Sequence, residues 1–568
     1  MSPNFSASAA AAAVAFLLGY NDFGFASVHA ADADTKWYAP AKSEINDLDA
    51  VASGSGVYGF IYNSSKTPDD KYGVYNWCNM PHVRRNEYVK ASDEYELKYV
   101  ELMHRHHKRT PYSSNAFPVE SYQWNCDDIA LYYYAQPFAG PTADRSYQQG
   151  YISPVNPFVP SGWIGTCKFP QITAGGLEDS WQHGADLYGV YHDLLGFLPD
   201  RDSSNVPSSV KYRVTNNIIT SQVAGMVING MWDTTEPVPI LVQAQGIDGL
   251  EPQYKCPSSS KLFDQIKSSS DADWQAHLDR ARDLYRTLDD ISGVPEDDGG
   301  FHASFDHYYD NLSARECHEK PLPCKLVDGK NSTTCVTQEL ADAVYRWGHW
   351  EYSHIYRDAP LSLPASAASI GVWIGEFTTH LRDVISGKSE DIYYHNVAHD
   401  GSVSRLLSVL QLDKMVWPGM GSEVVFELYR KKQGSGQPTP TVVAPNCNRD
   451  NCLRHMIRQT ASASSYCAEL TATSAAWPTQ CGGSASRVSS ACSCLGLPSA
   501  TSSAAPTQTA EPENGEYYIR VLFGGQVLRS SSPTLGLMDM VPVQKLLDYL
   551  DGLVGVGASK VKADCNSN

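Results

Sequence analysis

The chain has 568 residues, with 44 lysines and arginines against 63 aspartates and glutamates, and a formal net charge of −19 at pH 7. This acidic balance excludes the broad positive surface that binding to nucleic acids or anionic membranes requires. Hydrophobic residues make up 42% of the chain and aromatic residues 11%, which is typical of a globular protein rather than a disordered one.

An apolar, alanine-rich stretch near the start of the chain is typical of a secretory signal peptide. It runs from Ala9 to Leu18, and small residues up to Ala30 offer a cleavage site. Because no lysine or arginine precedes it, an alanine-rich disordered N-terminus stays open as an alternative. We predict a signal peptide over residues 1–30. Since no later apolar run approaches 18 residues, we predict no membrane span.

The cysteines and the glycosylation sequons indicate an oxidising compartment. Fourteen cysteines, an even number, lie beyond the leader, and none has the paired C-x-x-C spacing of a zinc ribbon, so we expect disulfides. Acceptor sequons at Asn63, Asn311 and Asn331 are candidates for glycosylation. We therefore expect a secreted protein that is extracellular or part of the cell wall.

The segment Gly54–Gly59 matches the G-x-G-x-x-G pattern of dinucleotide-binding loops. It follows a polar stretch and leads into another one, so it lacks the strand and the helix that such a loop joins. The sequence contains no G-x-x-x-x-G-K-[ST] phosphate-binding loop and no G-x-S-x-G nucleophile motif. We expect no cofactor.

A strand predicted over Tyr95–Met103 runs directly into the pattern R-H-x-x-R-x-P. The fixed residues of this pattern are Arg105, His106, Arg109 and Pro111. Two guanidinium groups that flank a histidine at the carboxyl end of a strand can clamp a phosphate, with the imidazole in line with phosphorus. The alternative is a solvated basic turn.

The histidines around this motif raise the question of a metal site. His104 and His106 lie at alternate positions, which face the same way on a strand, and His107 follows them. No nearby carboxylate or cysteine in the sequence completes a ligand set. We therefore expect no metal.

A His-Asp pair far downstream has a similar setting at the end of a strand. His399 and Asp400 follow a strand predicted over Ile392–Ala398 and precede a helix predicted over Ser402–Leu412. The alternative is an aspartate that only caps the helix. A second pair, at residues 192–193, falls inside a helical pattern, and we reject it as catalytic.

Together these motifs resemble the histidine acid phosphatases of the phosphoglycerate mutase-like superfamily. Arg105–Pro111 is similar to the signature of that family, and His399-Asp400 to its downstream pair. Gln171-Ile172-Thr173 with Gly176, and Met540-Val541-Pro542, extend the likeness. The resemblance covers residues 58–433 and 515–553 and points to a secreted fungal type with an inserted cysteine-rich module.

The resemblance implies a role for each residue of the two motifs. His106 is the nucleophile that forms a phosphohistidine, and Asp400 is the proton donor. Arg105, Arg109 and His399 bind the phosphate, so the reaction needs neither a metal nor another cofactor. The predicted partner is a small phosphomonoester, and nucleic acid is not expected.

Two departures from the family pattern concern the phosphate site. The third arginine of the family is absent, because Ile219 stands where it is expected. Its loss reduces phosphate affinity or rate by about ten- to a hundred-fold, unless Lys108 or Arg213 reaches the anion instead. His107 replaces the usual glycine beside the nucleophile. Lys108, Arg213 and His107 are therefore further candidates for phosphate binding.

Alternating strand-like and helical segments predict an α/β fold, a doubly wound three-layer sandwich with a mainly helical cap at about residues 231–346. Residues 437–514 form a separate module with six cysteines between Ser-, Thr- and Pro-rich linkers. The runs at 424–429 and 517–523 flank it and can pair as antiparallel strands. We therefore expect the core over 31–436 and 515–568.

These observations lead to one main functional expectation and one alternative. The main expectation is a secreted acid phosphatase that hydrolyses phosphomonoesters through phosphohistidine. The alternative is a catalytically weakened protein of the same fold that acts in the cell wall or binds glycans through residues 437–514. Hydrolysis of an aryl phosphate distinguishes the two.

Overall fold

The computed structural model describes residues 34–59, 74–432 and 516–567, together with parts of the range 451–492. Within 74–432 it leaves out residues 121, 130, 135–144, 149–150, 152, 160–161, 202–205 and 235. The predicted signal peptide and Asn63 lie outside the described residues. Among the helices of the described residues, none combines the length and the apolar character that crossing a membrane requires.

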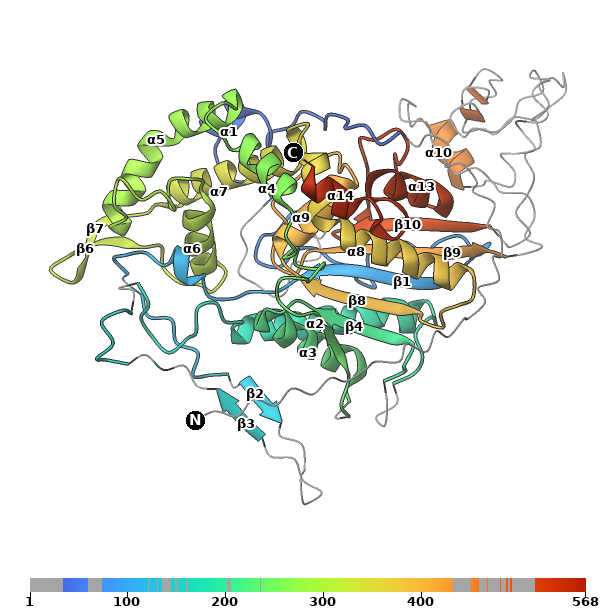
Figure 1. Ribbon diagram of the computed structural model, residues 1–568, viewed down its shortest axis with the longest axis horizontal. Coiled ribbons are helices and arrows are strands. Elements are labelled where there is room, and N and C mark those ends of the chain that lie inside the picture. The colour runs from blue at the N-terminus through green and yellow to red at the C-terminus, as the bar shows by residue number, and fades with distance from the viewer. Residues whose placement is uncertain are drawn as a thin grey trace, which may run out of the picture.

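A mixed β-sheet forms the centre of the molecule, with the strand order β11-β10-β9-β1-β8-β4-β5 and β12 paired to β10 (Figure 1). Strands β1, β8, β4 and β5 are parallel, whereas β9, β10, β11 and β12 pair antiparallel with their neighbours. The strands are β1 Tyr95–Arg105, β4 Val210–Val214, β5 Ile240–Val242, β8 Tyr393–Ala398, β9 Glu423–Lys431, β10 Tyr517–Phe523, β11 Gln526–Val527 and β12 Val541–Pro542.

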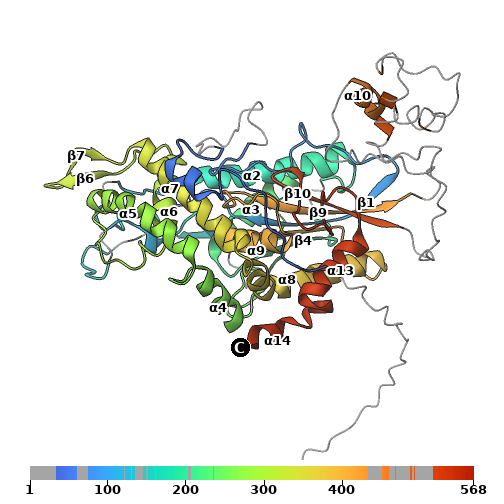
Figure 2. The same cartoon turned by 90° about the horizontal axis from the view of Figure 1, so that it is seen from above.

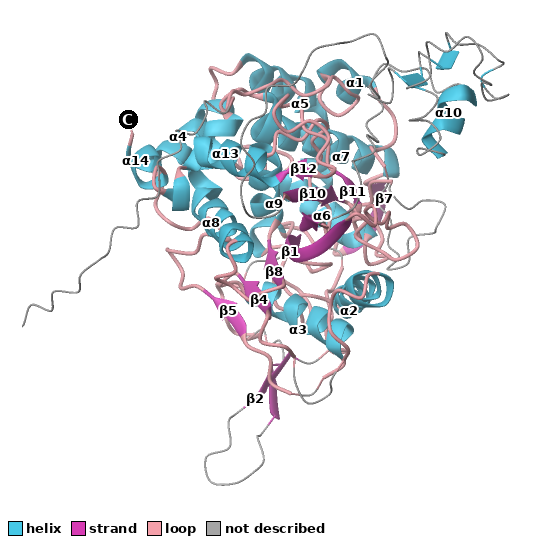
Figure 3. Cartoon of the chain, turned by 90° about the vertical axis from the view of Figure 1, so that its right-hand side faces the viewer, coloured by secondary structure: helices cyan, strands magenta, loops and turns pink. Residues whose placement is uncertain are grey.

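Successive residues of β1 pack into two different hydrophobic layers. Tyr99 and Met103 lie in one layer, and Val100 and Leu102 in the other, because side chains alternate between the faces of a strand. Figure 3 shows α8 and α13 on one side of the sheet and α2 and α3 on the other. This confirms the predicted three-layer α/β sandwich. The covering helices are α2 Ala174–Tyr188, α3 Ile218–Trp232, α8 Ser362–Ile385, α9 Asp400–Val409 and α13 Val543–Val554.

A second group of helices packs around its own aromatic cluster, which includes Trp274, Tyr309 and Trp347. Figure 2 shows these helices at one end of the sheet, and we refer to them with their hairpin as the cap. The cap consists of α5 Ala272–Ser292, α6 Asp306–Glu316, β6 Cys324–Val327, β7 Lys330–Cys335 and α7 Gln338–Ser353. Helix α4, Pro257–Ile266, falls in the predicted cap range but packs against the start of α8.

Strands β9 and β10 pair antiparallel, as predicted, from Arg430↔Tyr517 to Val424↔Phe523. The backbone N–H of Lys431 donates to the carbonyl of Glu516 at 2.9 Å, so the two ends of the insertion lie side by side. In the described part of the insertion, α10 spans Asn451–Arg458. The remaining described elements are α1 Leu48–Ser53, β2 Leu131–Tyr134, β3 Arg145–Gln148 and α14 Val561–Asn566.

Six disulfides lie among the described residues, and each closes within the core or within the module, as predicted. Cys447 and Cys494 lie outside the described residues. The pairs in the core are Cys78–Cys317, Cys126–Cys167, Cys256–Cys565 and Cys324–Cys335, and those in the module are Cys452–Cys481 and Cys467–Cys492.

Candidate active site

The two sequence motifs meet because β1 and β8 are parallel neighbours. Arg105 pairs with Ala398 at the carboxyl ends of these strands. The backbone N–H of His106 donates to the carbonyl of Ala398 at 3.0 Å, and the N–H of Gly421 donates to the carbonyl of His106 at 3.1 Å. As a result, the rings of His106 and His399 lie edge to face with their centroids 5.4 Å apart.

The Gln171–Gly176 motif holds the loop that follows His106. Arg109 forms an isolated β-bridge with Ile172, and the N–H of Thr110 donates to the carbonyl of Gln171 at 2.9 Å. A Cβ atom on Gly176 would lie 2.0 Å from the carbonyl oxygen of Lys108, so only glycine allows this close approach. The motif is thus a structural support for the loop.

The imidazole of His106 is buried and oriented by its own chain. Its Nδ1 lies 3.0 Å from the carbonyl oxygen of His107, which can only accept a hydrogen bond, so Nδ1 carries the proton. The lone pair is therefore on Nε2. Burial, followed by the charges of Arg109 and Arg105, holds the pKa of His106 well below its usual value. The ring is consequently a neutral nucleophile even in acid.

Arg105 connects the strand end to Asp400. Its guanidinium lies 3.1 Å from Oδ2 of Asp400, donates to the carbonyl of Pro418, and stacks on the ring of Trp77 with its carbon 4.7 Å from the ring centre. The Trp417 indole N–H also donates to Oδ2 of Asp400, at 2.8 Å. Burial raises the pKa of Asp400, but Arg105 and the Trp417 hydrogen bond outweigh it and leave the pKa below its ordinary value.

Arg109 is held by a carboxylate from the cap. Its guanidinium donates to Asp310 of α6 at 2.9 Å and lies over the ring of Tyr112, 4.1 Å from its centre. Asp310 also accepts from the N–H of Tyr112 at 3.0 Å and from the amide of Asn115 at 2.8 Å. A single cap residue, Asp310, therefore holds both the Arg109 guanidinium and the backbone of the loop that follows β1.

His399 forms the N-cap of α9, and Asp400 is the first residue of that helix. The Nε2 atom of His399 lies 3.0 Å from the hydroxyl oxygen of Thr215 at the end of β4. The same atom lies 3.5 Å from a carboxylate oxygen of Glu251. Burial raises the pKa of Glu251, but the neighbouring His399 lowers it below the ordinary value. His399 therefore faces both a hydroxyl and a carboxylate.

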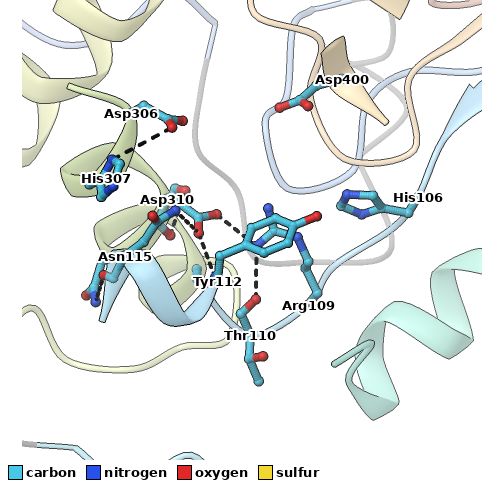
Figure 4. A network of polar contacts seen from close by, with 12 residues as sticks. His106, Arg109, Thr110, Tyr112, Asn115, Asp306, His307, Asp310 and Asp400 are labelled. Carbon is cyan, nitrogen blue, oxygen red and sulfur yellow. Dashed lines mark hydrogen bonds and ion pairs between the residues drawn. The ribbon is translucent and has the colours of Figure 1, made fainter. Parts of the chain in front are cut away.

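A second cap carboxylate, Asp306, lies across from Asp400. Figure 4 shows Asp306 and Asp400 extending toward one another from opposite sides, with His106 pointing into the same space. Burial and the charges of Asp310 and Asp400 raise the pKa of Asp306 to about 7. Its side chain is about half exposed, with 48% of its surface accessible. The free site thus has a second carboxyl group that is largely neutral in acid.

The further candidates for phosphate binding have other partners. Lys108 pairs with buried Asp179 at 3.0 Å. Arg213 forms ion pairs with Glu376 and, at 3.4 Å, with Asp248. His107 points away into a cluster of histidines behind β1. The structure therefore brings His106, Arg105, Arg109, His399 and Asp400 together, and it leaves Lys108, Arg213 and His107 outside the site.

The glycosylation candidates differ in their environments. Asn311 lies in α6 with 1% of its surface exposed, and its amide donates to the carbonyl of Asn115 at 2.9 Å. This placement leaves no room for a glycan, so the expectation for Asn311 is wrong for the folded protein. Asn331 is exposed in β7, on the β6–β7 hairpin.

Several residues of the site carry no recognisable signal in the sequence. Asp310 and Trp417 contact motif residues from separate helices and loops. The hydroxyl of Tyr352, from α7, also lies 3.3 Å from Oδ2 of Asp400. Their only link to the motifs is spatial, and a single sequence offers no spacing rule for contacts between such distant segments.

The arrangement combines a neutral nucleophile, fixed cations and a carboxyl group. Nε2 of His106 can attack an electrophilic centre, Arg105 and Arg109 can bind the anionic oxygens around it, and Asp400 can exchange a proton with a leaving group. Within the described residues these groups supply what transfer of a phosphoryl group to histidine requires.

Comparison with known proteins gives distant matches. No family model matches the chain. Counting factor 60 of Dictyostelium discoideum is 24% identical over 355 residues, which cover 60% of this chain and 77% of that protein.

Among solved structures, the phytase from D. castellii matches over 93% of this chain and 95% of its own, with 13% identity and a TM-score of 0.39. Hafnia alvei phytase matches over 60% and 83%, with 12% identity and a TM-score of 0.40. A Bifidobacterium longum multiple inositol polyphosphate phosphatase matches over 62% and 89%, with 10% identity and a TM-score of 0.36. The two motifs of this chain, which meet at the carboxyl ends of β1 and β8, resemble those of the histidine acid phosphatases.

Proposed function

We propose that the protein is a secreted acid phosphatase that hydrolyses phosphomonoesters through a phosphohistidine on His106. The observation that carries this proposal is the orientation of His106. Its Nδ1 proton is held by the carbonyl of its neighbour, so the Nε2 lone pair is available beside Arg105, Arg109 and His399. The disulfides of the core and module support an extracellular location.

In the first step, Nε2 of His106 attacks phosphorus, and the P–O bond to the leaving group breaks. Arg105, Arg109 and His399 neutralise the equatorial oxygens as their charge is redistributed. Asp400 gives its proton to the departing oxygen, so the leaving group departs as an alcohol. Neutral His106 and cationic arginines perform these tasks without a divalent ion.

In the second step, water attacks the phosphohistidine. The carboxylate of Asp400 takes a proton from that water, the N–P bond breaks, and phosphate is released. Both steps require Asp400 to alternate between its two protonation states. The bound phosphate competes with Asp400 for Arg105, and its own negative charge favours the protonated carboxyl, so substrate binding reverses the low pKa of the free site.

The proposal is tested by trapping the intermediate. With a ³²P-labelled aryl phosphate, rapid quenching into base should yield a phosphohistidine in the wild type and none in His106→Ala, whose turnover should fall by a factor on the order of 10³ or more. His192→Ala, on an exposed histidine, is the matched control and should behave like the wild type. Turnover that survives in His106→Ala would refute the nucleophile.

Inositol phosphates belong in the substrate panel, because the matched structures are named as phytases and inositol polyphosphate phosphatases. Because the pKa of Asp306 is raised to about 7, its carboxyl group is largely neutral in acid, so it should repel a further phosphate near α6 only as the pH rises past that value. The alternative function, glycan or cell-wall binding on a weakened phosphatase scaffold, predicts retention on polysaccharide without turnover of any ester in the panel.

A further inference from the structure

A cluster of buried histidines lies directly behind the nucleophile. His104 and His107 come from the end of β1 and the loop after it, and His183 comes from α2. All three side chains are buried, and one ring nitrogen of each lies within 4.8 Å of the others. None of these nitrogens faces the phosphate site, so the proposed phosphatase reaction leaves the cluster unexplained.

The distances inside this cluster require a proton or a cation between the nitrogens. Nε2 of His107 lies 3.2 Å from Nε2 of His104 and 3.2 Å from Nδ1 of His183. Two imidazole lone pairs cannot face each other at that separation, so a proton or a cation must lie between them. Neutral imidazoles carry one N–H each, and one proton has to serve three converging nitrogens here.

The outer nitrogens of His183 and His104 have the partners that orient metal ligands. Nε2 of His183 lies 3.0 Å from a carboxylate oxygen of Glu423, and Nδ1 of His104 lies 3.1 Å from Nε2 of His395. When each outer nitrogen donates its proton, the lone pairs of His183 Nδ1 and His104 Nε2 point toward His107. A carboxylate or other acceptor behind a histidine is the usual support of a metal-bound imidazole.

We propose that His104, His107 and His183 bind a single transition-metal ion, with Zn²⁺ preferred. Neutral imidazoles suit Zn²⁺, and a Zn–N bond of about 2.0–2.1 Å in tetrahedral geometry separates ligand nitrogens by about 3.3–3.4 Å. Two of the three separations, at 3.2 Å, are already close to that value. The third separation, between Nε2 of His104 and Nδ1 of His183, shortens when one of these imidazoles turns toward the other.

Burial supports this assignment. The side chains of His104, His107 and His183 are fully buried, so bulk water does not solvate their converging nitrogens. The Nδ1 atom of His107 has no hydrogen-bond partner among the described residues. Both oxygens of Glu423 are occupied, by His183 and by the N–H of Val83, so this carboxylate supports His183 and is not itself a ligand, and the fourth ligand would be a water molecule.

The ion would act as a structural clamp close to the catalytic residue. It would join the loop after β1 to α2, and in that loop the carbonyl of His107 accepts a hydrogen bond from the Nδ1–H of His106. Gly421 packs against the ring of His107 so closely that a Cβ there would lie 2.3 Å from its Cε1. His107, which replaces the glycine of the family motif, is thereby explained as a metal ligand rather than as a phosphate ligand.

Metal content of the tag-free full-length protein tests the proposal. After dialysis against a chelator, the wild type is incubated with ZnCl₂ and passed through gel filtration, and mass spectrometry of the metal should find about one zinc per chain. X-ray absorption should show about three imidazole nitrogens at ~2.0 Å. A wild type that retains no zinc, or a spectrum without imidazole ligands, overturns the proposal.

Two variants locate the ion. His183→Gln should lose the retained zinc, whereas His192→Gln, an exposed histidine on the continuation of the same helix, should keep it. If His183→Gln does not fold, His107→Gly serves instead and should also retain no zinc. Zinc should raise the melting temperature of the wild type by several degrees and leave that of the folded variant unchanged. Retention of zinc by His183→Gln and by His107→Gly would refute the site.

Discussion

The guanidinium of Arg105 lies 3.1 Å from the carboxylate of Asp400, so a proposed phosphate ligand and the proposed proton donor are paired in the free site. This pairing lowers the pKa of Asp400. Under the proposed function, a phosphate that takes over the arginine would raise this pKa, so binding of the anion and protonation of the acid would be coupled. The carboxyl group of Asp400 would then carry its proton mainly when a substrate is bound, which is when the leaving group needs that proton.

The substitution Asp400→Asn should affect substrates according to their leaving groups. An alkoxide needs a proton to depart, whereas an aryl oxide departs with little help. We expect kcat to fall by about 10²–10⁴-fold for alkyl phosphates and by much less for aryl phosphates. Steady-state rates on a matched series of esters measure the difference. Equal losses across the series would contradict the acid role of Asp400.

The pH profile should reflect the low pKa of His106. Burial and the two arginines keep this imidazole neutral below its usual range, so acidification removes the nucleophile only well below pH 6.5. Hydrolysis of aryl phosphates should therefore stay high in moderate acid. The profile should be measured with two aryl phosphates whose own pKa values differ. A fall in rate whose midpoint shifts with the ester reports ionisation of the ester, and one that does not shift reports ionisation of the enzyme. A fall in rate that belongs to the enzyme and has its midpoint near the ordinary histidine pKa would count against a low pKa of His106.

Asp310 should act on phosphate binding through Arg109. In Asp310→Asn the buried guanidinium loses its counter-charge, and we expect KM and the phosphate inhibition constant to rise about ten-fold or more. Asp179→Asn removes the partner of Lys108, a buried pair outside the site, and is the matched control. Both variants should lower the melting temperature, and only Asp310→Asn should change KM. Equal effects on KM would remove the special role of Asp310.

Gly421→Ala should destabilise the protein more than Gly536→Ala. Both glycines have left-handed backbone angles, with φ of 72° and 56°, so both variants incur a strain of about 1–2 kcal/mol. A Cβ at Gly421 also collides with His107, which adds about 1–3 kcal/mol, whereas nothing lies within 4 Å of a Cβ at Gly536. Calorimetry gives the difference. Identical melting temperatures of the two variants would show that the loop around His107 can move to accommodate the added Cβ without a loss of stability.

Replacement of residues 433–515 by a short Asn-Gly turn should leave a folded, active enzyme. The hydrogen bond between Lys431 and Glu516 places the two ends of the insertion side by side. Lys431 pairs with Tyr95, at the opposite end of β1 from Arg105, a distance of about 33 Å along the strand. Unchanged kcat/KM together with lost polysaccharide retention would assign glycan binding to the module. Loss of turnover in a folded variant would contradict this separation.

Much of this architecture is predictable from local patterns. The Arg105–Pro111 and His399-Asp400 motifs lie at strand ends, and parallel pairing of β1 with β8 brings them together. The β9–β10 pairing follows from two β-branched and aromatic runs. These features depend on periodicity and residue type, which a single sequence displays.

The remaining features depend on contacts between distant segments. His183 joins the histidine cluster from α2, and Asp310 reaches Arg109 from the cap, so neither contact follows from spacing near the motif. For the same reason, Lys108 and Arg213 are plausible phosphate ligands in sequence but pair with carboxylates in the fold. The sequon at Asn311 is likewise overruled by burial in α6.

The disulfide between Cys78 and Cys317 joins the residue next to Trp77 to the end of α6. Trp77 supports the guanidinium of Arg105, and α6 carries Asp306 and Asp310. A covalent bond at this point limits the movement of α6 relative to the segment that carries Trp77. For the proposed phosphatase, we expect the size of the alcohol, rather than a moving lid, to limit which esters reach His106.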